Sequence, residues 1–340
     1  GSKLSGSLRW TLSDVRKERL QGSSGKRLTW GNCSLGPGNR HFTRPRHLSF
    51  HHLSFRSLMA RLVRIASIQP PAVGDGVSYQ QMQDTAISLV GQAGTMGTDV
   101  VCLPEYANCM GDESVWQQPG EAEQDPVFEK IARLASSYSM YVILPLLEGR
   151  DGRRYNTSVI LDRTGEILGR YDKTHLTAVE REDQAVTAGD DYPVFDLDFG
   201  RIGIMTCYDG HFPEVARLLG VGGAEIIFFP SLQRRLTAEH LELQVRCRAI
   251  DNCLWVVRSS YGHDDDVPWM PGLAAGKSCI VDFEGTVLAD AGPRVGMAQY
   301  AIDLDRLRTK ERSFGGALGD ARTFLLDDRR PSTYGALLEE

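Results

Sequence analysis

An apolar run that stops at a cysteine is the stretch of this chain with the clearest chemical character. Residues 201–206 are apolar, rich in β-branched types and preceded by Gly200, and residues 213–219 have the apolar period of a helix. Cys207 is therefore predicted to lie on a turn between a strand and a helix, where its side chain is lifted out of the sheet and the helix N-terminus favours a thiolate. A lone free cysteine more often packs as a small hydrophobic residue, so other signals are needed.

Two charged residues far from Cys207 in the sequence also follow predicted strands. Glu105 comes directly after a buried strand predicted over residues 98–103, and Lys173 comes directly after a predicted hairpin. By itself each of them is more often a solvated surface charge. In α/β folds, however, the chemistry collects at the carboxyl ends of the strands. The three positions together therefore indicate a site that combines a carboxylate, an ammonium group and a thiol.

Three segments in fixed order resemble the nitrilase superfamily of carbon–nitrogen hydrolases. They are Leu103-Pro104-Glu105, Asp172-Lys173-Thr174-His175 and Cys207-Tyr208-Asp209-Gly210-His211-Phe212-Pro213-Glu214. The likeness extends from about Leu62 to near the C-terminus, and further stretches agree with it at residues 188–190, 199–203, 248–252 and 329–335. The resemblance implies a hydrolytic enzyme with a Glu-Lys-Cys triad and the fold of that superfamily.

The same resemblance implies a role for each member of the triad. Cys207 would be the nucleophile and Glu105 its general base, because a thiol with the ordinary pKa of about 8.5 is only a few per cent ionised at neutral pH. Lys173 and the backbone N–H of Tyr208 would stabilise the tetrahedral oxyanion. Glu105 would then protonate the leaving group and activate water against the thioester. This chemistry requires no metal and no organic cofactor.

A second glutamate follows the lysine in the family and positions both the lysine and the substrate. Glu180 lies seven residues after Lys173, and Glu182 lies two residues further on. The residues around Glu180 are more similar to the family pattern, so we predict Glu180 and keep Glu182 as the alternative. Substrate contacts are expected from loops next to the triad segments, at Tyr106, Asn108 and Ser231.

The residues after the nucleophile bear on the reaction. Cys-Tyr-Asp at 207–209 resembles the amidase and N-carbamoyl-amine hydrolase branches of the superfamily. We therefore expect hydrolysis of a small linear amide or N-carbamoyl compound through a covalent thioester. Conversion of a nitrile to acid and ammonia by the same triad is the first alternative. The second alternative is a binding or interaction module in which the triad is vestigial.

The elements that must position these residues follow from the hydrophobic periodicity. Strands and helices alternate in two halves of β–α–β type with hairpins between them, which predicts an α/β fold: an α-β-β-α sandwich of two mixed sheets packed together, flanked by helices and followed by a C-terminal tail. Helices are expected at 79–90, 126–138, 213–219 and 239–250. Strands are expected at 62–68, 98–103, 140–147, 156–162, 166–171, 194–197, 201–206, 224–231, 253–259, 278–283, 286–289 and 297–302.

Charge divides the chain into two parts. Residues 1–58 hold eleven Lys and Arg but two Asp and Glu, whereas the whole chain carries a net charge of −6. We expect residues 1–58 to be a basic Ser/Gly/Arg-rich extension outside the fold, either an upstream or added segment or a targeting peptide, and residues 59–340 to form one carbon–nitrogen hydrolase domain. The acidic balance of that domain argues against nucleic acid or an anionic membrane as its partner.

Cysteine usage and the C-terminus complete the expectations. The seven cysteines are scattered without Cys-x-x-Cys spacing, which is typical of free thiols in a reducing compartment and predicts a cytoplasmic protein without a zinc site. No apolar run reaches the roughly 18 to 20 residues that span a bilayer. The segment 328–334 resembles tails that reach across a subunit partner in this family, so a homodimer or larger assembly is expected.

Overall fold

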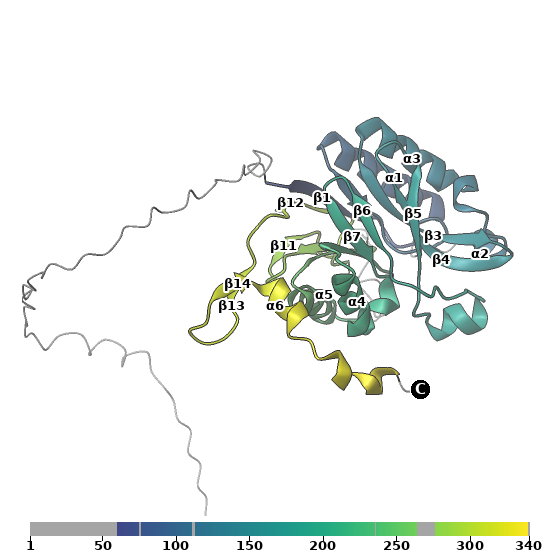
Figure 1. Cartoon of the computed structure of the whole chain (residues 1–340). Coiled ribbons are helices and arrows are strands. Elements are labelled where there is room, and N and C mark those ends of the chain that lie inside the picture. Colours follow the sequence, from purple (N-terminus) through teal and green to yellow (C-terminus); the bar gives the residue numbers. More distant parts are fainter. Residues whose placement is uncertain (1–59, 75, 111–112, 235, 264–275, 339–340) are drawn as a thin grey trace, which may run out of the picture. The chain divides into compact units, whose positions relative to one another are not determined.

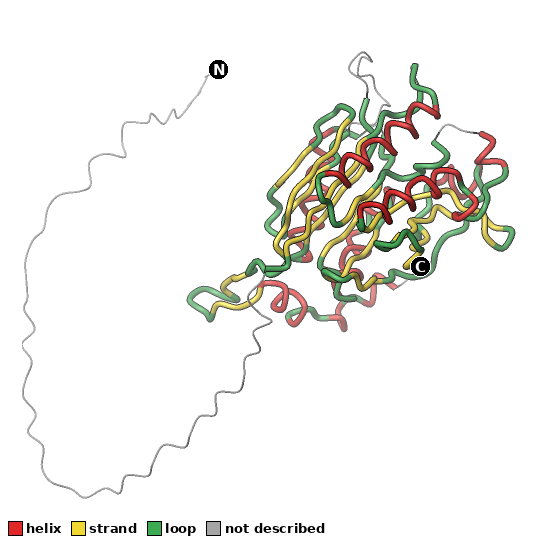
Figure 2. The backbone as a smooth tube through the Cα atoms, turned by 90° about the horizontal axis from the view of Figure 1, so that it is seen from above, coloured by secondary structure: helices red, strands yellow, loops and turns green. Residues whose placement is uncertain are grey.

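The computed structural model describes residues 60–338, apart from residues 75, 111–112, 235 and 264–275. The extension predicted over residues 1–58 lies outside the described residues, so the expected division of the chain at residue 59 stays a prediction. Within the described part, two mixed six-stranded sheets pack against each other and helices cover their outer faces (Figures 1 and 2). The predicted α-β-β-α sandwich is thereby confirmed.

The first sheet combines a parallel centre with antiparallel edges. Its order is β12 (Gly296–Asp303), β1 (Leu62–Gln69), β2 (Val100–Cys102), β3 (Tyr141–Arg150), β4 (Arg153–Leu161) and β5 (Ile167–Asp172). Strands β1, β2 and β3 are parallel to one another. β12 is antiparallel to β1, β4 is antiparallel to β3, and β5 is antiparallel to β4. Two reversals separate β3 from β5, so β5 runs in the same direction as β2 and the two strands end on the same side of the sheet.

The second sheet repeats this plan. Its order is β11 (Val287–Asp290), β10 (Cys279–Val281), β9 (Trp255–Ser259), β8 (Ile226–Pro230), β7 (Gly200–Ile204) and β6 (Val194–Leu197). Strands β7, β8 and β9 are parallel, and β6, β10 and β11 are antiparallel to their neighbours. The loops after β7 and β8 therefore lie at one end of this sheet.

The apolar side chains form three layers. The central layer joins the inner faces of the two sheets and includes Ile65, Ile143, Ile204, Phe228 and Val257, all fully buried. A second cluster packs the outer face of the first sheet against α1 (Tyr79–Thr95) and α3 (Pro126–Tyr138), and a third packs the second sheet against α4 (Pro213–Val221) and α5 (Ala238–Asn252). Burial of this kind stabilises a fold by roughly 25 cal/mol per Å² of apolar surface.

Local signals explain where the helices begin. Ser78 and Gln81 form a capping box at the start of α1. At α3, Asp125 accepts the N–H of Val127 and Pro126 occupies the first turn, which confirms the predicted start of this helix. These caps satisfy N–H groups that have no partner within the helix.

Turn chemistry moves the ends of two predicted strands in the structure. The strand expected from residue 253 begins at Trp255, because Cys253 has a left-handed φ of 51° and caps the C-terminus of α5. The strand expected to reach residue 206 ends at Ile204, because Thr206 is already the N-cap of a 3₁₀ turn over Cys207–His211. Both shifts come from turn chemistry that apolar periodicity does not reveal.

Short elements near the C-terminus were absent from the sequence-based description. β13 (Thr309–Glu311) and β14 (Leu318–Asp320) form a small antiparallel hairpin, and α6 (Ala321–Asp327) follows it. A further short helix, α2 (Glu113–Gln117), precedes α3. In the part of the chain that the structure describes, no helix has both the length and the apolar character needed to cross a membrane.

Candidate active site

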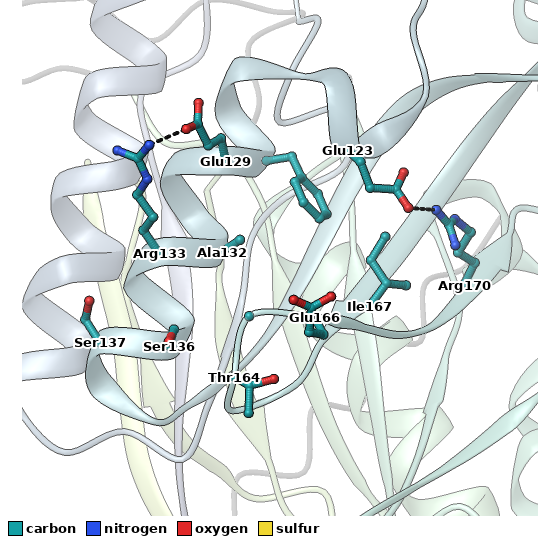
Figure 3. Close-up of a pocket in the computed structure, with 12 residues that line it drawn as sticks. Glu123, Glu129, Ala132, Arg133, Ser136, Ser137, Thr164, Glu166, Ile167 and Arg170 are labelled. Carbon is teal, nitrogen blue, oxygen red and sulfur yellow. Dashed lines mark hydrogen bonds and ion pairs between the residues drawn. The ribbon is translucent and has the colours of Figure 1, made fainter.

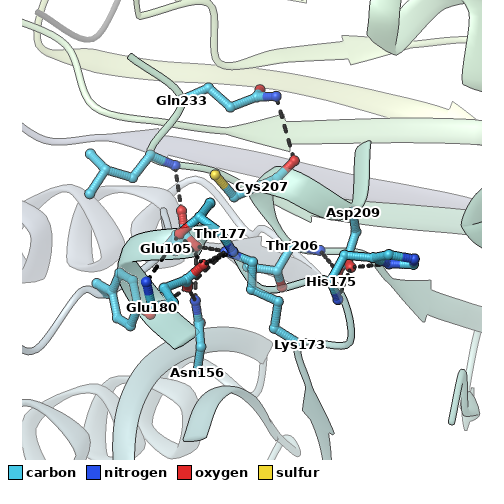
Figure 4. Close-up of polar contacts among 12 residues, drawn as sticks. Glu105, Asn156, Lys173, His175, Thr177, Glu180, Thr206, Cys207, Asp209 and Gln233 are labelled. Atoms are coloured by element: carbon cyan, nitrogen blue, oxygen red, sulfur yellow. Dashed lines mark hydrogen bonds and ion pairs between the residues drawn. The ribbon is translucent and has the colours of Figure 1, made fainter. Parts of the chain in front are cut away.

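The three residues of the predicted triad come from the carboxyl ends of three strands. Glu105 follows β2, Lys173 follows β5 directly, and Cys207 follows β7. The first two strands belong to one sheet and the third belongs to the other. Figure 4 shows their side chains converging between the two sheets. The packing of the two sheets therefore brings together residues that lie far apart in the sequence.

Glu105 is held by donors on both of its carboxylate oxygens. Its Oε1 accepts hydrogen bonds from Lys173 Nζ at 2.9 Å and from Asn156 Nδ2 at 2.8 Å. Its Oε2 accepts the backbone N–H of Leu232 at 2.8 Å. The residue is 2% exposed, and its own carbonyl accepts the hydroxyl of Tyr261. A buried carboxylate with this many donors is fixed in place.

Lys173 lies between two carboxylates. Besides Glu105, its Nζ contacts both carboxylate oxygens of Glu180 at 2.8 Å. Burial alone would disfavour the ammonium, but the charges around it, with Glu105 first, outweigh this effect and raise the pKa of Lys173. Burial would likewise raise the pKa of Glu180, but the Lys173 ammonium lowers it to about 2. Glu180 is therefore ionised beside a charged lysine at neutral pH.

The structure separates the two glutamates that the sequence left as alternatives. Glu180 is buried, and its Oε2 accepts the N–H and the hydroxyl of Thr177, each at 2.8 Å. Its Oε1 accepts the Tyr106 hydroxyl at 2.7 Å. Glu182 instead lies on the surface, where it pairs with Arg181. The second glutamate next to the lysine is thus Glu180.

Cys207 has a left-handed backbone conformation with a φ of 48°. Such a conformation is uncommon for a residue with a side chain and recurs where a nucleophile is presented on a sharp turn after a strand. Burial and then the neighbouring Glu105 carboxylate raise the pKa of Cys207. The Lys173 charge and the Leu232 N–H act in the opposite direction. In the free protein the thiol is therefore protonated and faces a carboxylate.

Asp209 holds the turn that carries Cys207. The side chain is fully buried, and its Oδ2 accepts the Thr206 N–H at 2.8 Å and the Tyr171 hydroxyl at 2.7 Å. Its Oδ1 accepts the N–H of His175 at 3.0 Å. Because Tyr171 and His175 flank Lys173, this one carboxylate joins the cysteine turn to the lysine segment. In the sequence, Asp209 belongs to the motif that begins at Cys207, and no separate role was predicted for it. Its position two residues after the cysteine is the signal that marks it.

Asn156 is a site residue that sequence reasoning missed. Its Nδ2 donates to Glu105 Oε1 and also to Glu180 Oε1, at 2.9 Å. Its Oδ1 is buried without a hydrogen-bond partner among the described residues. The available signal was a run of three polar residues, 156–158, directly before the apolar residues 159–161, and all three are buried.

The three residues predicted for the substrate pocket differ in their positions relative to the cavity at Cys207. Tyr106 lines the cavity at Cys207, in a left-handed conformation with a φ of 60°. Asn108 does not line this cavity, because its amide donates to Asp125 and to the carbonyl of Leu147 and accepts the Leu147 N–H. Ser231 is fully buried, and its hydroxyl has no hydrogen-bond partner among the described residues. The prediction for Asn108 therefore has no support in the geometry.

Tyr208, whose backbone N–H was predicted to face the oxyanion, follows the cysteine on the same 3₁₀ turn. Its ring is about one third exposed and packs edge-on against Phe212, at 5.2 Å between ring centroids. The first N–H groups of a helical turn have no partner within that turn, so the position is suitable for an oxyanion donor.

A cavity of about 360 Å³ opens at the triad. Its charged lining residues are Glu105, Lys173, Glu180 and Arg234. A larger cavity, of about 830 Å³, lies over α3 and the β4–β5 turn (Figure 3). That cavity contains the ion pairs Arg133–Glu129 and Arg170–Glu123 but no cysteine or lysine. Among the described residues, no group of three or more His, Cys, Asp or Glu side chains is arranged to hold a metal ion.

Solved structures share this architecture. A carbon–nitrogen hydrolase from Helicobacter pylori G27 superimposes with a TM-score of 0.68 at 24% identity, over 83% of this chain and 99% of that one. An amidase from Nesterenkonia sp. superimposes with a TM-score of 0.65 at 21% identity, over 81% of this chain and 96% of that one. Fold and site together define an α/β protein in which a cysteine, a lysine and a glutamate follow strand ends and a second glutamate, Glu180, contacts the lysine.

Sequence comparison makes the assignment more specific. The carbon-nitrogen hydrolase family model matches residues 64–312. The omega-amidase NIT2 of Homo sapiens is 30% identical over 231 residues, which cover 65% of this chain and 83% of the relative. The deaminated glutathione amidase of a Synechocystis strain is 30% identical over 237 residues, or 66% and 86% of the two chains. The chain belongs to the carbon–nitrogen hydrolase family, within the nitrilase superfamily.

Proposed function

We propose that this hydrolase cleaves the C–N bond of a small linear amide or N-carbamoyl compound, with Cys207 as nucleophile, Glu105 as general base and Lys173 as the stabilising cation. The observation that carries the proposal is the position of Glu105, which contacts the Lys173 ammonium and lines the same cavity as Cys207. Both sequence relatives are amidases by name, which favours an amide over a nitrile.

The first half of the reaction transfers one proton and forms one bond. Because the pKa of the Cys207 thiol is raised, the thiolate is not stored in the free enzyme. Glu105 instead takes the proton while Sγ attacks the carbonyl carbon, and the oxyanion forms next to Lys173 and the Tyr208 N–H. When the tetrahedral intermediate collapses, Glu105 returns the proton to the leaving nitrogen, and ammonia or an amine departs.

The second half regenerates the thiol. Cys207 now carries the acyl group as a thioester, and Glu105 accepts a proton from the water that attacks it. The acid leaves and the proton returns to the sulfur. Glu180 has a positioning role, since it contacts Lys173 through both carboxylate oxygens and keeps the ammonium beside Glu105. No step requires a metal or an organic cofactor.

The test is ammonia release from matched amides, carbamoyl compounds and nitriles. Cys207→Ala is expected to lower kcat on the preferred amide by at least about 10³-fold. The matched control is Cys247→Ala, which removes an exposed thiol on α5 and is expected to keep wild-type turnover. Equal turnover in Cys207→Ala and the wild type would favour the non-catalytic module. Faster ammonia release from a nitrile than from its matching amide would favour a nitrilase.

A further inference from the structure

A further cavity, of about 340 Å³, lies between the turn that carries Cys207 and helix α5. We call it the α5 cavity. It is lined by His211, at the end of the turn, and by the α5 side chains His240, Leu243, Gln244, Cys247 and Arg248. It shares no lining residue with the cavity at the triad. The proposed reaction uses none of these side chains, so the α5 cavity is open to a separate role.

The α5 cavity is lined by basic groups and by no carboxylate. Arg248 forms its floor, because this side chain is buried whereas His211 and His240 are exposed. The ring centroids of the two histidines are 6.2 Å apart. Partial burial, and then the His240 and Arg248 charges, lower the pKa of His211, and no carboxylate charge opposes them. The cavity therefore gathers positive charge that the protein does not neutralise within it.

Arg248 uses only part of its hydrogen-bonding capacity within the protein. The residue is 9% exposed, and its Nη2 donates to the carbonyl of Gly210 at 2.9 Å. Its Nε is buried without a hydrogen-bond partner among the described residues, and its Nη1 forms no hydrogen bond with them. A buried guanidinium with unused donors and no carboxylate partner is costly unless an anion accepts from it. The unused donors of Arg248 therefore indicate an anionic ligand.

We propose that the α5 cavity binds a phosphate group, with Arg248 as its main contact and His211 and His240 as further donors. N–H groups on three side chains match the several oxygens of a phosphate, whereas a carboxylate offers only two oxygens. A metal ion is disfavoured because it would lie beside the Arg248 charge. In addition, no group of three or more His, Cys, Asp or Glu side chains in the described part of the chain is arranged to hold one.

The α5 cavity also contacts the support of the nucleophile turn. Gln244, which lines the cavity, accepts a hydrogen bond from Gln233 Nε2 at 3.0 Å. The same Nε2 donates to the Cys207 carbonyl at 3.5 Å (Figure 4), and Arg248 holds the carbonyl of Gly210 on this turn. A phosphate group in the α5 cavity therefore lies against the back of the turn and does not enter the cavity at the triad.

Calorimetric titration at constant ionic strength tests the site, with inorganic phosphate and ethyl phosphate as ligands and acetate for comparison. The wild type is expected to bind phosphate saturably and more tightly than acetate. Arg248→Gln is expected to weaken phosphate binding by about 10- to 100-fold, the range for a lost charged hydrogen bond. His240→Glu, which places a carboxylate at an exposed position of the lining, is expected to weaken it as well and decides the matter if Arg248→Gln fails to fold.

Two control variants locate the bound phosphate. Arg246→Gln removes a charge from the same helix outside the α5 cavity, and Arg234→Gln removes an exposed charge from the cavity at the triad. Both are expected to bind phosphate as the wild type does. Binding that falls in His240→Glu and persists in both controls supports the site, and the tighter of the two phosphate ligands shows whether the free ion or an ester occupies it.

Three results would overturn the inference. They are the absence of saturable phosphate binding, equal binding in the wild type and His240→Glu, and a loss of binding in Arg234→Gln. Acetate that binds as tightly as phosphate would also exclude the proposed ligand class. None of these measurements depends on turnover, so a failure of amide hydrolysis would leave the phosphate site standing.

Discussion

At the scale of single residues, the proton on Cys207 is the point on which the chemistry depends. Burial and the Glu105 carboxylate both favour the protonated thiol, so the same neighbour that accepts the proton during the reaction also keeps it on sulfur beforehand. This arrangement protects a reactive thiol in the resting enzyme. It also means that a lower thiol pKa does not by itself give a faster enzyme.

Replacement of Glu105 tests this reasoning. In Glu105→Gln the negative neighbour is gone, so the pKa of Cys207 is expected to fall, while turnover is expected to fall about 10²- to 10⁴-fold because the base is lost. The measurement is the pH dependence of iodoacetamide alkylation. It is followed on the peptide that contains Cys207, because the exposed thiol of Cys247 reacts with the reagent as well. The midpoint should lie above the ordinary value of about 8.5 in the wild type and move toward it in the variant. A midpoint that stays or rises would contradict the account.

At the scale of elements, the site is a consequence of strand direction. β2, β5 and β7 end at the same side of the sandwich, and each is followed within three residues by a residue with chemistry: Glu105, Lys173 or Cys207. Hydrophobic periodicity and residue type placed these residues at strand ends, and the resemblance of their three segments to the nitrilase superfamily grouped them. The sandwich itself followed from the alternation of strands and helices.

Other parts of the site could not be read in this way. Asn156 lies within β4, in a run of three polar residues that marks the place but does not show which of the three serves the site. Asn108 was expected in the pocket because it follows Glu105 closely, but the loop turns back and all its side-chain hydrogen bonds go to Asp125 and β3. Which way a loop turns depends on tertiary hydrogen bonds that a pattern of residue types does not encode.

Asp209 carries a prediction at the element scale. Its removal leaves several buried donors without an acceptor, among them the Thr206 N–H and the Tyr171 hydroxyl. We expect Asp209→Ala to lower the free energy of unfolding by about 3 kcal/mol, measured by urea denaturation. The control is Asp196→Ala on β6. This aspartate is exposed and pairs with Arg201, and loss of the pair is expected to lower the free energy of unfolding by less than about 1 kcal/mol. Equal losses in the two variants would show that Asp209 does not hold the turn.

At the scale of the whole molecule, the C-terminal segment stands apart from the compact sandwich. Its large apolar side chains at Leu307, Phe314, Leu318 and Leu338 are mostly exposed. Soluble monomers rarely gather such side chains in one segment, because apolar patches of this kind mark contact surfaces. This observation agrees with the expectation that the tail reaches a second copy of the chain, which stays a prediction.

Light scattering at micromolar concentration tests the assembly. The chain is expected to have at least twice its own mass of 37.6 kDa. The double variant Phe314→Ser with Leu318→Ser is expected to shift the mass toward a single chain, because it removes apolar contact area. Leu168→Ser, which changes a partly exposed leucine on β5, is the control and is expected to leave the mass unchanged. A mass of one chain for the unchanged protein would refute the predicted assembly.

The central claim is that Cys207 carries the acyl group during turnover. Rapid acid quenching of the wild type with its preferred amide, followed by peptide mass spectrometry, measures this directly. The account predicts an acyl adduct on the peptide that contains Cys207, which appears within the first turnover, and no adduct in Cys207→Ser. The account would be contradicted if the wild type turned over fully without an adduct on that peptide and Cys207→Ser kept the same turnover.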